Sequence, residues 1–162
     1  MSDISFTTSA AIHIGGIITE SGLDTLVCAI AASSVGGDWG AKFHSAAEIV
    51  QHARAAAAGG SPLHLVSFEA PDGAFPSIEQ ACRDLGLTYV RGTDCRPDGS
   101  GAVVMWWPGM DQPRSWVGTV DAHEPCLPYR RIVELIEADE LPKELALMKA
   151  AFERPEGLQI AA

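Results

Sequence analysis

The sequence predicts an α+β or α/β protein: a single domain, residues 1–162, in which helices flank a mixed sheet of four to five strands. Its length is that of one domain, and its 47% apolar and 20% charged residues are ordinary for a globular fold. Segments with strand periodicity alternate along the chain with segments of helical periodicity. Such an alternation is typical of a sheet flanked by helices.

The first strand is expected at residues 10–18, AAIHIGGII. Its glycine pair indicates a bulge or the close approach of another backbone segment. A helix follows from Ser21, and its apolar side chains recur with helical spacing at Leu23, Leu26, Val27 and Ile30. A second, alanine-rich helix is expected after the capping box formed by Ser45 and Glu48.

Residues 63–91 indicate a compact unit of strand, turn, helix and strand. Pro76 suits the first turn of its helix, because the N–H that proline lacks has no helical partner there. Gly86 suits a left-handed helix end. The unit predicts that strands 63–69 and 87–91 lie side by side in the same direction, joined by a right-handed crossover.

The strand AVVMWW, residues 102–107, is expected to pair antiparallel with 87–91 as a hairpin, and SWVGTV at 115–120 is a candidate short strand. The chain then ends with two helices and a loose tail, at 128–141, 143–153 and 154–162. The expected order of elements is β-α-α-β-α-β-β-α-α.

With the second helix set aside, this order resembles that of the thioredoxin-like fold. The resemblance rests on the order of elements alone. Where that family carries its Cys-x-x-Cys motif, after the first strand, this chain has Thr19-Glu20-Ser21-Gly22. The resemblance therefore implies no redox activity.

The net charge of −10 is spread over the chain, with no long block of like charge. Such a charge repels nucleic acid and anionic membranes, so neither is expected as a partner. No run of about 20 apolar residues is present, and the first residues lack the basic and apolar regions of a signal peptide. A cytoplasmic location is the resulting expectation.

No cofactor or metal is expected. The four cysteines contain no Cys-x-x-Cys pair and are interpreted as small buried apolar residues: Cys28, Cys82, Cys95 and Cys126. The histidines form no HxH or HExxH motif. His13 and His64 lie in two predicted strands, and both would approach one face if those strands pair.

The strongest functional signal is the aromatic segment 106–116, WWPGMDQPRSW. Tryptophan, methionine and arginine are enriched at protein interfaces. The segment predicts a binding or interaction module whose partner is a second copy of the chain, as a homodimer, or another protein. An alternative is that the tryptophans only cover the sheet. The candidate binding residues are Trp106, Trp107, Met110, Arg114 and Trp116.

Two other functions stay open, although the sequence favours binding over catalysis. One is a small-molecule enzyme with a pocket at the ends of the first two strands, near Glu20, Glu69 and Asp72. The competing interpretation is that Glu69 and Asp72 only cap the helix that follows them. The other function is an acidic decoy for a nucleic-acid-binding protein.

Overall fold

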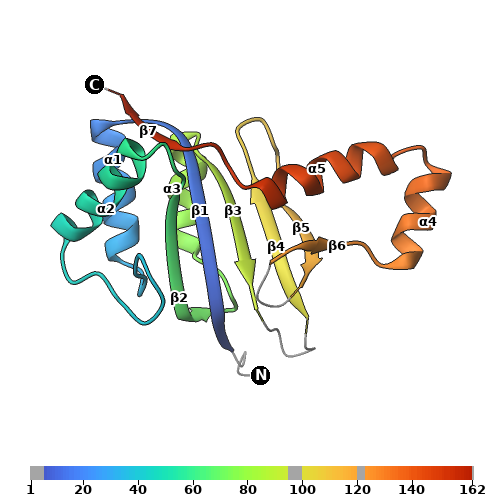
Figure 1. The fold of residues 1–162 in the computed structure, drawn as a ribbon, viewed down its shortest axis with the longest axis horizontal. Helices are drawn as coiled ribbons and strands as arrows, with labels where there is room; N and C mark the ends of the chain where they lie inside the picture. Colours follow the sequence, from blue (N-terminus) through green and yellow to red (C-terminus); the bar gives the residue numbers. More distant parts are fainter. Residues whose placement is uncertain (1–5, 95–99, 120–122, 162) are drawn as a thin grey trace.

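The computed structural model describes residues 6–94, 100–119 and 123–161 (Figure 1). Its class is α+β, with five helices and seven strands in the described residues. In chain order these are β1 (Thr7–Thr19), α1 (Glu20–Ala31), α2 (Ala46–Ala58), β2 (Leu63–Pro71), α3 (Pro76–Leu85), β3 (Thr88–Thr93), β4 (Gly101–Trp106), β5 (Arg114–Gly118), β6 (Pro125–Cys126), α4 (Tyr129–Glu137), α5 (Leu141–Glu153) and β7 (Leu158–Ala161). Within the described residues, no helix has the length and apolar character needed to cross a membrane.

The expected sheet of four to five strands is wrong, because the sheet has seven. Six strands follow the order β2-β1-β3-β4-β5-β6, and every neighbouring pair along it is antiparallel. β7 adds to the end of β1 in the parallel direction. The tail that was expected to be loose therefore contributes a strand, and its Leu158 is fully buried.

The predicted side-by-side pairing of strands 63–69 and 87–91 is also wrong. β2 and β3 both run antiparallel to β1, so they share a direction, but β1 lies between them. α3 therefore crosses over β1. β1 is 13 residues long and mostly buried, which suits a strand paired on both edges better than an edge strand.

The resemblance in element order to the thioredoxin-like fold does not extend to strand direction. That order places a parallel β-α-β unit at the start of the chain, whereas β1 and β2 are antiparallel neighbours here. The predicted hairpin between 87–91 and 102–107 is confirmed as β3 and β4, with Val90 opposite Met105.

Local helix signals are mostly confirmed. Ser45 Oγ accepts a hydrogen bond from the Glu48 N–H at 3.3 Å, α3 begins at Pro76, and Gly86 ends that helix with a φ of 67°. α1 begins one residue before the expected Ser21, and Thr19 provides its cap by accepting a hydrogen bond from Gly22 N–H. These signals act through neighbouring backbone groups, so sequence alone determines them.

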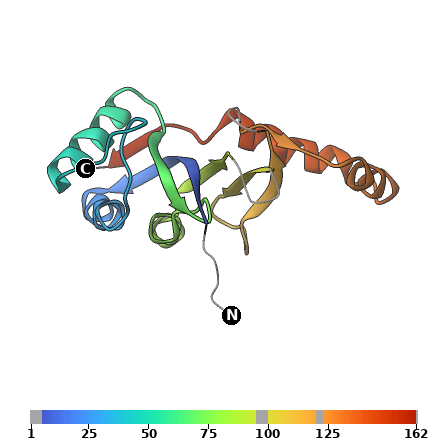
Figure 2. The same ribbon diagram turned by 90° about the horizontal axis from the view of Figure 1, so that it is seen from below.

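The helices cover the two faces of the sheet unequally (Figures 1 and 2). α1 and α3 pack together on one face, α2 packs against α1 and the edge formed by β2 and β7, and α5 lies on the opposite face. We call this opposite face the open face, since α5 covers only part of it. The main core, between the sheet and α1 and α3, includes Ile12, Ile14, Leu26, Leu65, Ile78 and Tyr89.

A buried ion pair joins α3 to the sheet. Arg91 on β3 and Glu79 on α3 place Nε and Oε1 2.8 Å apart, and both side chains are about nine-tenths buried. Arg91 also donates to the carbonyl of Gly73, and Glu79 Oε1 accepts from the Phe75 N–H at 3.0 Å. The pair thus fixes the turn before α3, the helix and the sheet relative to one another.

We predict that Arg91→Met lowers the free energy of unfolding by about 3–5 kcal/mol, because Glu79 would be left as a buried charge without its partner. The double variant Arg91→Met/Glu79→Met should lose less than Arg91→Met alone, since neither charge remains. Urea unfolding followed by circular dichroism measures all four proteins of the cycle. If the stability losses of the two single variants added up to the loss of the double variant, the pairing of Arg91 with Glu79 would be contradicted.

Candidate functional site

The aromatic segment 106–116 is divided between the two faces of the sheet. Trp106 is buried on the α1 and α3 side, and its Nε1 donates to the Met110 carbonyl at 3.0 Å. Trp107 is half-buried and packs with the open-face cluster. Trp116 is buried on the open face and donates to Glu144 Oε1 at 2.7 Å, and Arg114 forms an ion pair with the same carboxylate. The five residues therefore do not form one continuous patch.

The carboxylates of the enzyme hypothesis lie at opposite ends of the sheet. Thr7 at the start of β1 lies opposite Pro71 at the end of β2, so Glu20, just after β1, and Glu69, near the end of β2, lie at opposite ends of these strands. Both are exposed ion-pair partners, Glu20 with Arg54 at 2.6 Å and Glu69 with Lys42 at 3.6 Å.

The turn before α3 does not use the expected acidic caps. Asp72 is exposed with a φ of 51°, and no side chain caps the first residue of the helix. Glu79, inside α3, accepts the Phe75 N–H instead. Glu79, the fourth residue of α3, therefore performs the capping that was expected of Glu69 and Asp72, because its buried partner Arg91 holds it there.

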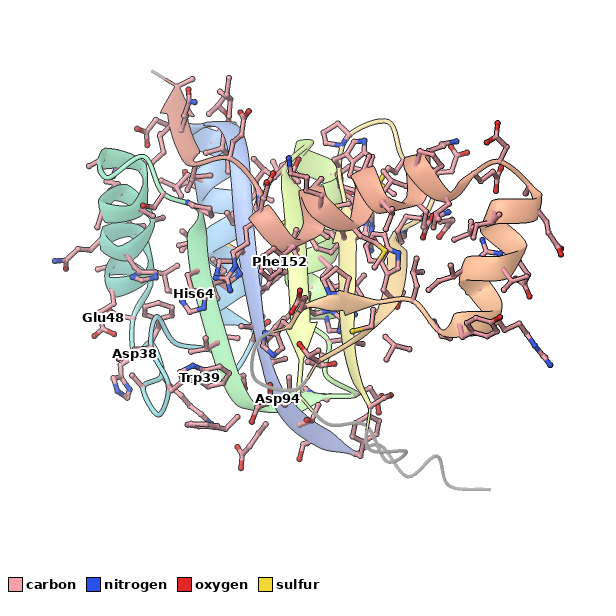
Figure 3. The ribbon with its side chains drawn as sticks, turned by 45° about the vertical axis from the view of Figure 1, so that its right-hand side comes forward. Asp38, Trp39, Glu48, His64, Asp94 and Phe152 are labelled. Atoms are coloured by element: carbon pink, nitrogen blue, oxygen red, sulfur yellow. The ribbon has the colours of Figure 1, made fainter. Side chains whose placement is uncertain are left out.

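Two histidines lie together on the open face, as the pairing of their strands implies. His13 and His64 are directly opposite each other across β1 and β2, and their rings stack with centroids 4.4 Å apart. His13 is only 9% exposed, while His64 is half-buried. Figure 3 shows His64 on this face, between Asp38 and Trp39 of the loop before α2 and Phe152 of α5.

Arg154 reaches this histidine pair from the end of α5. The glycine pair of β1 allows its approach, because a Cβ at Gly15 would overlap the carbonyl oxygen of Glu156. The Gly16 N–H faces the Gly157 carbonyl at 3.4 Å, and β7 pairs with β1 directly afterwards. The close backbone approach predicted from the glycines is therefore real, and it positions Arg154 beside His13.

Arg154 has an unfavourable backbone conformation and no carboxylate partner among the described residues. Its φ of 70° and ψ of 167° lie in a region used almost only by glycine. Its NH1 lies 2.5 Å from His13 Nε2. Six of the seven ion pairs in the described residues join an arginine or lysine to a carboxylate, whereas Arg154 contacts a neutral ring.

The contact with Arg154 fixes the protonation state of His13. A guanidinium can only donate, so His13 Nε2 accepts and the ring proton lies on Nδ1. Burial, followed by the charge of Arg154 and the neighbouring histidines, lowers the pKa of His13 to about 3. Burial and Arg154 also lower the pKa of His64. At neutral pH the site therefore holds two neutral imidazoles beside one permanent cation.

Other titratable groups surround the stack. His52 Nε2 donates to the His64 carbonyl at 2.9 Å, and Asp38 favours the charged form of His64 electrostatically. His123 lies 2.7 Å from Asp94 through Nε2 and Oδ1, and its ring packs where Gly92 has no side chain. The ring nitrogens of His64 have no hydrogen-bond partner in the described part of the chain.

A groove with a volume of about 270 Å³ lies beside His13 on the side away from His64, and Arg154 forms part of its wall. Val90, which lies opposite His13, forms its floor together with Met105 and Trp107. Glu156 stands on its rim. The groove is therefore largely apolar, with one cation and one carboxylate in its lining, and it contains one residue of the aromatic segment, Trp107.

Comparison with protein-family models, with curated proteins and with solved structures finds no match for this chain. In the described ranges, no group of three or more histidine, cysteine, aspartate or glutamate side chains is placed to hold a metal ion. Cys82 is buried as expected, whereas Cys28 is exposed and Cys126 is half-buried. Cys95 lies outside the described residues.

Sequence reasoning missed Arg154, which belongs to the tail that was expected to be loose. The glycine pair of β1 was a usable signal for a backbone approaching that strand. It could not identify the approaching segment, because residues 15–16 and 154–157 are far apart in the chain.

We predict that Arg154→Gly unfolds with a free energy about 1 kcal/mol higher than that of Arg154→Gln. Both variants remove the guanidinium, but only glycine adopts the observed backbone angles without strain. Chemical unfolding of the pair measures the difference. Equal stabilities would mean that residue 154 does not hold this conformation in solution.

The low pKa of His13 predicts a defined pH dependence. Between pH 6.5 and about 3 the unfolded chain binds a proton at His13 that the folded protein does not, so stability falls as the pH falls. Relative to His13→Gln, the wild type should lose about 2 kcal/mol more between pH 7.5 and pH 5. Urea titrations at both pH values test this, and parallel losses would show that His13 titrates normally.

Proposed function

We propose that the protein binds a small carboxylic acid with an apolar body on the open face, where Arg154 holds the carboxylate. The observation that carries the proposal is a strained, partly exposed arginine that has no acidic partner in the described residues of a strongly acidic chain. Strained backbone positions persist where the surrounding structure enforces them, and they cluster at ligand sites.

The charge of Arg154 supports an anionic ligand. The neighbouring imidazoles are neutral, so they do not repel the cation but do not neutralise it either. A guanidinium has five donors in a fork that matches a carboxylate, and His13 takes only one contact. The remaining donors can hold a carboxylate in the same plane.

His64 does not line the groove, but it supports an electrostatic response to the bound ligand. Its half-buried ring stacks on His13 and leaves its nitrogens without a hydrogen-bond partner among the described residues. A bound carboxylate favours a protonated imidazole nearby, because opposite charges raise the pKa of a histidine. Binding is therefore expected to draw a proton onto the stack and to become stronger as the pH falls toward 6.

The groove supports a small ligand with an apolar body. Its volume of about 270 Å³ is below the usual range of about 300–1,000 Å³ for ligand pockets. Met105 and Trp107 offer a thioether and an indole for contact with a ring or a short chain. Glu156 on the rim disfavours a ligand with a second negative charge. Trp107 connects this proposal to the binding role expected from the aromatic segment.

Isothermal titration calorimetry with benzoate, inorganic phosphate and benzamide tests the proposal. Benzoate should bind, whereas phosphate lacks the apolar body and benzamide lacks the charge. Arg154→Gln should weaken benzoate binding at least about tenfold, the scale of one lost charge-assisted contact. Arg54→Gln, which removes a paired arginine of α2, is the matched control and should bind normally.

The same titration in buffers of different ionisation enthalpy reports the protons taken up on binding. Net uptake near pH 6.5 is expected, and it should decrease in His64→Gln. Phosphate binding as strong as benzoate binding would point to a general anion site. Benzoate binding that survives Arg154→Gln unchanged would overturn the proposal.

A further inference from the structure

The hairpin of α4 and α5 extends away from the body of the protein, and α4 lies at its far end in both ribbon views (Figures 1 and 2). α4 packs mainly against α5, and α5 makes the main contacts of the hairpin with β4 and β6. A groove of about 510 Å³ separates the hairpin from β5 and β6. A nine-residue helix has little stability by itself, so α4 needs a packing partner on more than one side.

α4 is amphipathic, but only one of its apolar residues is buried. Leu135 packs inward, whereas Tyr129 is 82% exposed and Ile136 is 60% exposed. Ile132 and Val133 are half-buried between them. Residues three and four positions apart share one side of a helix. A continuous apolar stripe along α4 is therefore formed by Tyr129, Ile132, Val133 and Ile136.

The stripe has the same sequence pattern when it is read from either end. About the midpoint between Ile132 and Val133, Tyr129 at one end corresponds to Ile136 at the other. Two copies of α4 that pack antiparallel would therefore place Tyr129 of each against Ile136 of the other, with the two β-branched residues at the centre. A two-fold dimer requires such self-complementarity, because the same surface serves both copies.

The charges beside the stripe also favour an antiparallel arrangement. Arg130 and Glu137 lie on one flank of α4, and neither has an ion-pair partner among the described residues. In the antiparallel pair, Arg130 of one copy lies about 3 Å along the helix axis from the level of Glu137 of the other, which is within one helical turn. Each dimer would gain two such pairs, and a parallel arrangement would gain none.

We propose that the protein forms a homodimer through antiparallel packing of α4. A second copy fits this surface better than a partner of another kind, because the apolar stripe matches its own reversed sequence and the flanking charges of opposite sign come within one helical turn of each other. The contact also keeps the acidic bodies apart, since α4 is at the far end of the hairpin. This inference uses a surface distant from Arg154 and does not depend on the proposed ligand.

The size of the contact predicts a weak dimer. α4 is about 13 Å long, so the interface is smaller than the ~1,600 Å² of a standard stable complex. Dissociation in the micromolar range is therefore expected, and it should become weaker at high salt because the charge pairs are exposed.

Analytical ultracentrifugation of the full chain over about 5–500 μM tests the dimer. The wild type should change from monomer to dimer, and Ile136→Asp should weaken association at least about tenfold. Phe68→Asp, on an equally exposed residue of β2, is the matched control and should associate like the wild type. Circular dichroism shows whether each variant is folded.

Exchange of the two flanking charges distinguishes specific antiparallel pairing from non-specific association. Arg130→Glu alone should weaken the dimer, and Arg130→Glu/Glu137→Arg should restore it, because the exchanged charges face each other again. A wild type that stays monomeric throughout, or a double variant as weak as the single one, would overturn the proposal.

Discussion

The pairing of β1 on both of its edges is the constraint on which the rest of the structure depends. β1 separates β2 from β3, so the chain must cross it through α3, and the buried pair of Arg91 and Glu79 holds that crossover in place. The same strand brings His13 beside His64 and, through its glycine pair, accepts the backbone that carries Arg154. The core and the candidate site therefore share one structural origin.

Arg91 and Arg154 are held in very different environments. Arg91 is buried and paired with a carboxylate, and it donates to a carbonyl, which compensates for the removal of its charge from water. Arg154 remains partly in water, contacts a neutral histidine and has a strained backbone. The first arrangement stabilises the fold, whereas the second costs stability and leaves donors available. That contrast distinguishes a structural ion pair from a candidate ligand site.

The elements could be predicted from the sequence, but their arrangement could not. Caps such as Ser45 and Gly86 act within a few residues, and apolar periodicity placed the helices well. Strand neighbours depend on contacts between distant residues, so the position of β1 and the addition of β7 were not predictable from local patterns. Only part of the candidate site was predictable: the two histidines were expected to share a face if their strands paired, but Arg154 comes from the other end of the chain.

The central claim is that Arg154 donates to a neutral His13 whose proton lies on Nδ1. Nuclear magnetic resonance of the histidine ring nitrogens reports both the charge and the position of the proton. The structure predicts that His13 stays neutral, with Nε2 unprotonated, as the pH is lowered from 7 to 5. A His13 ring that becomes charged near pH 6.5, or that carries its proton on Nε2, would contradict the claim.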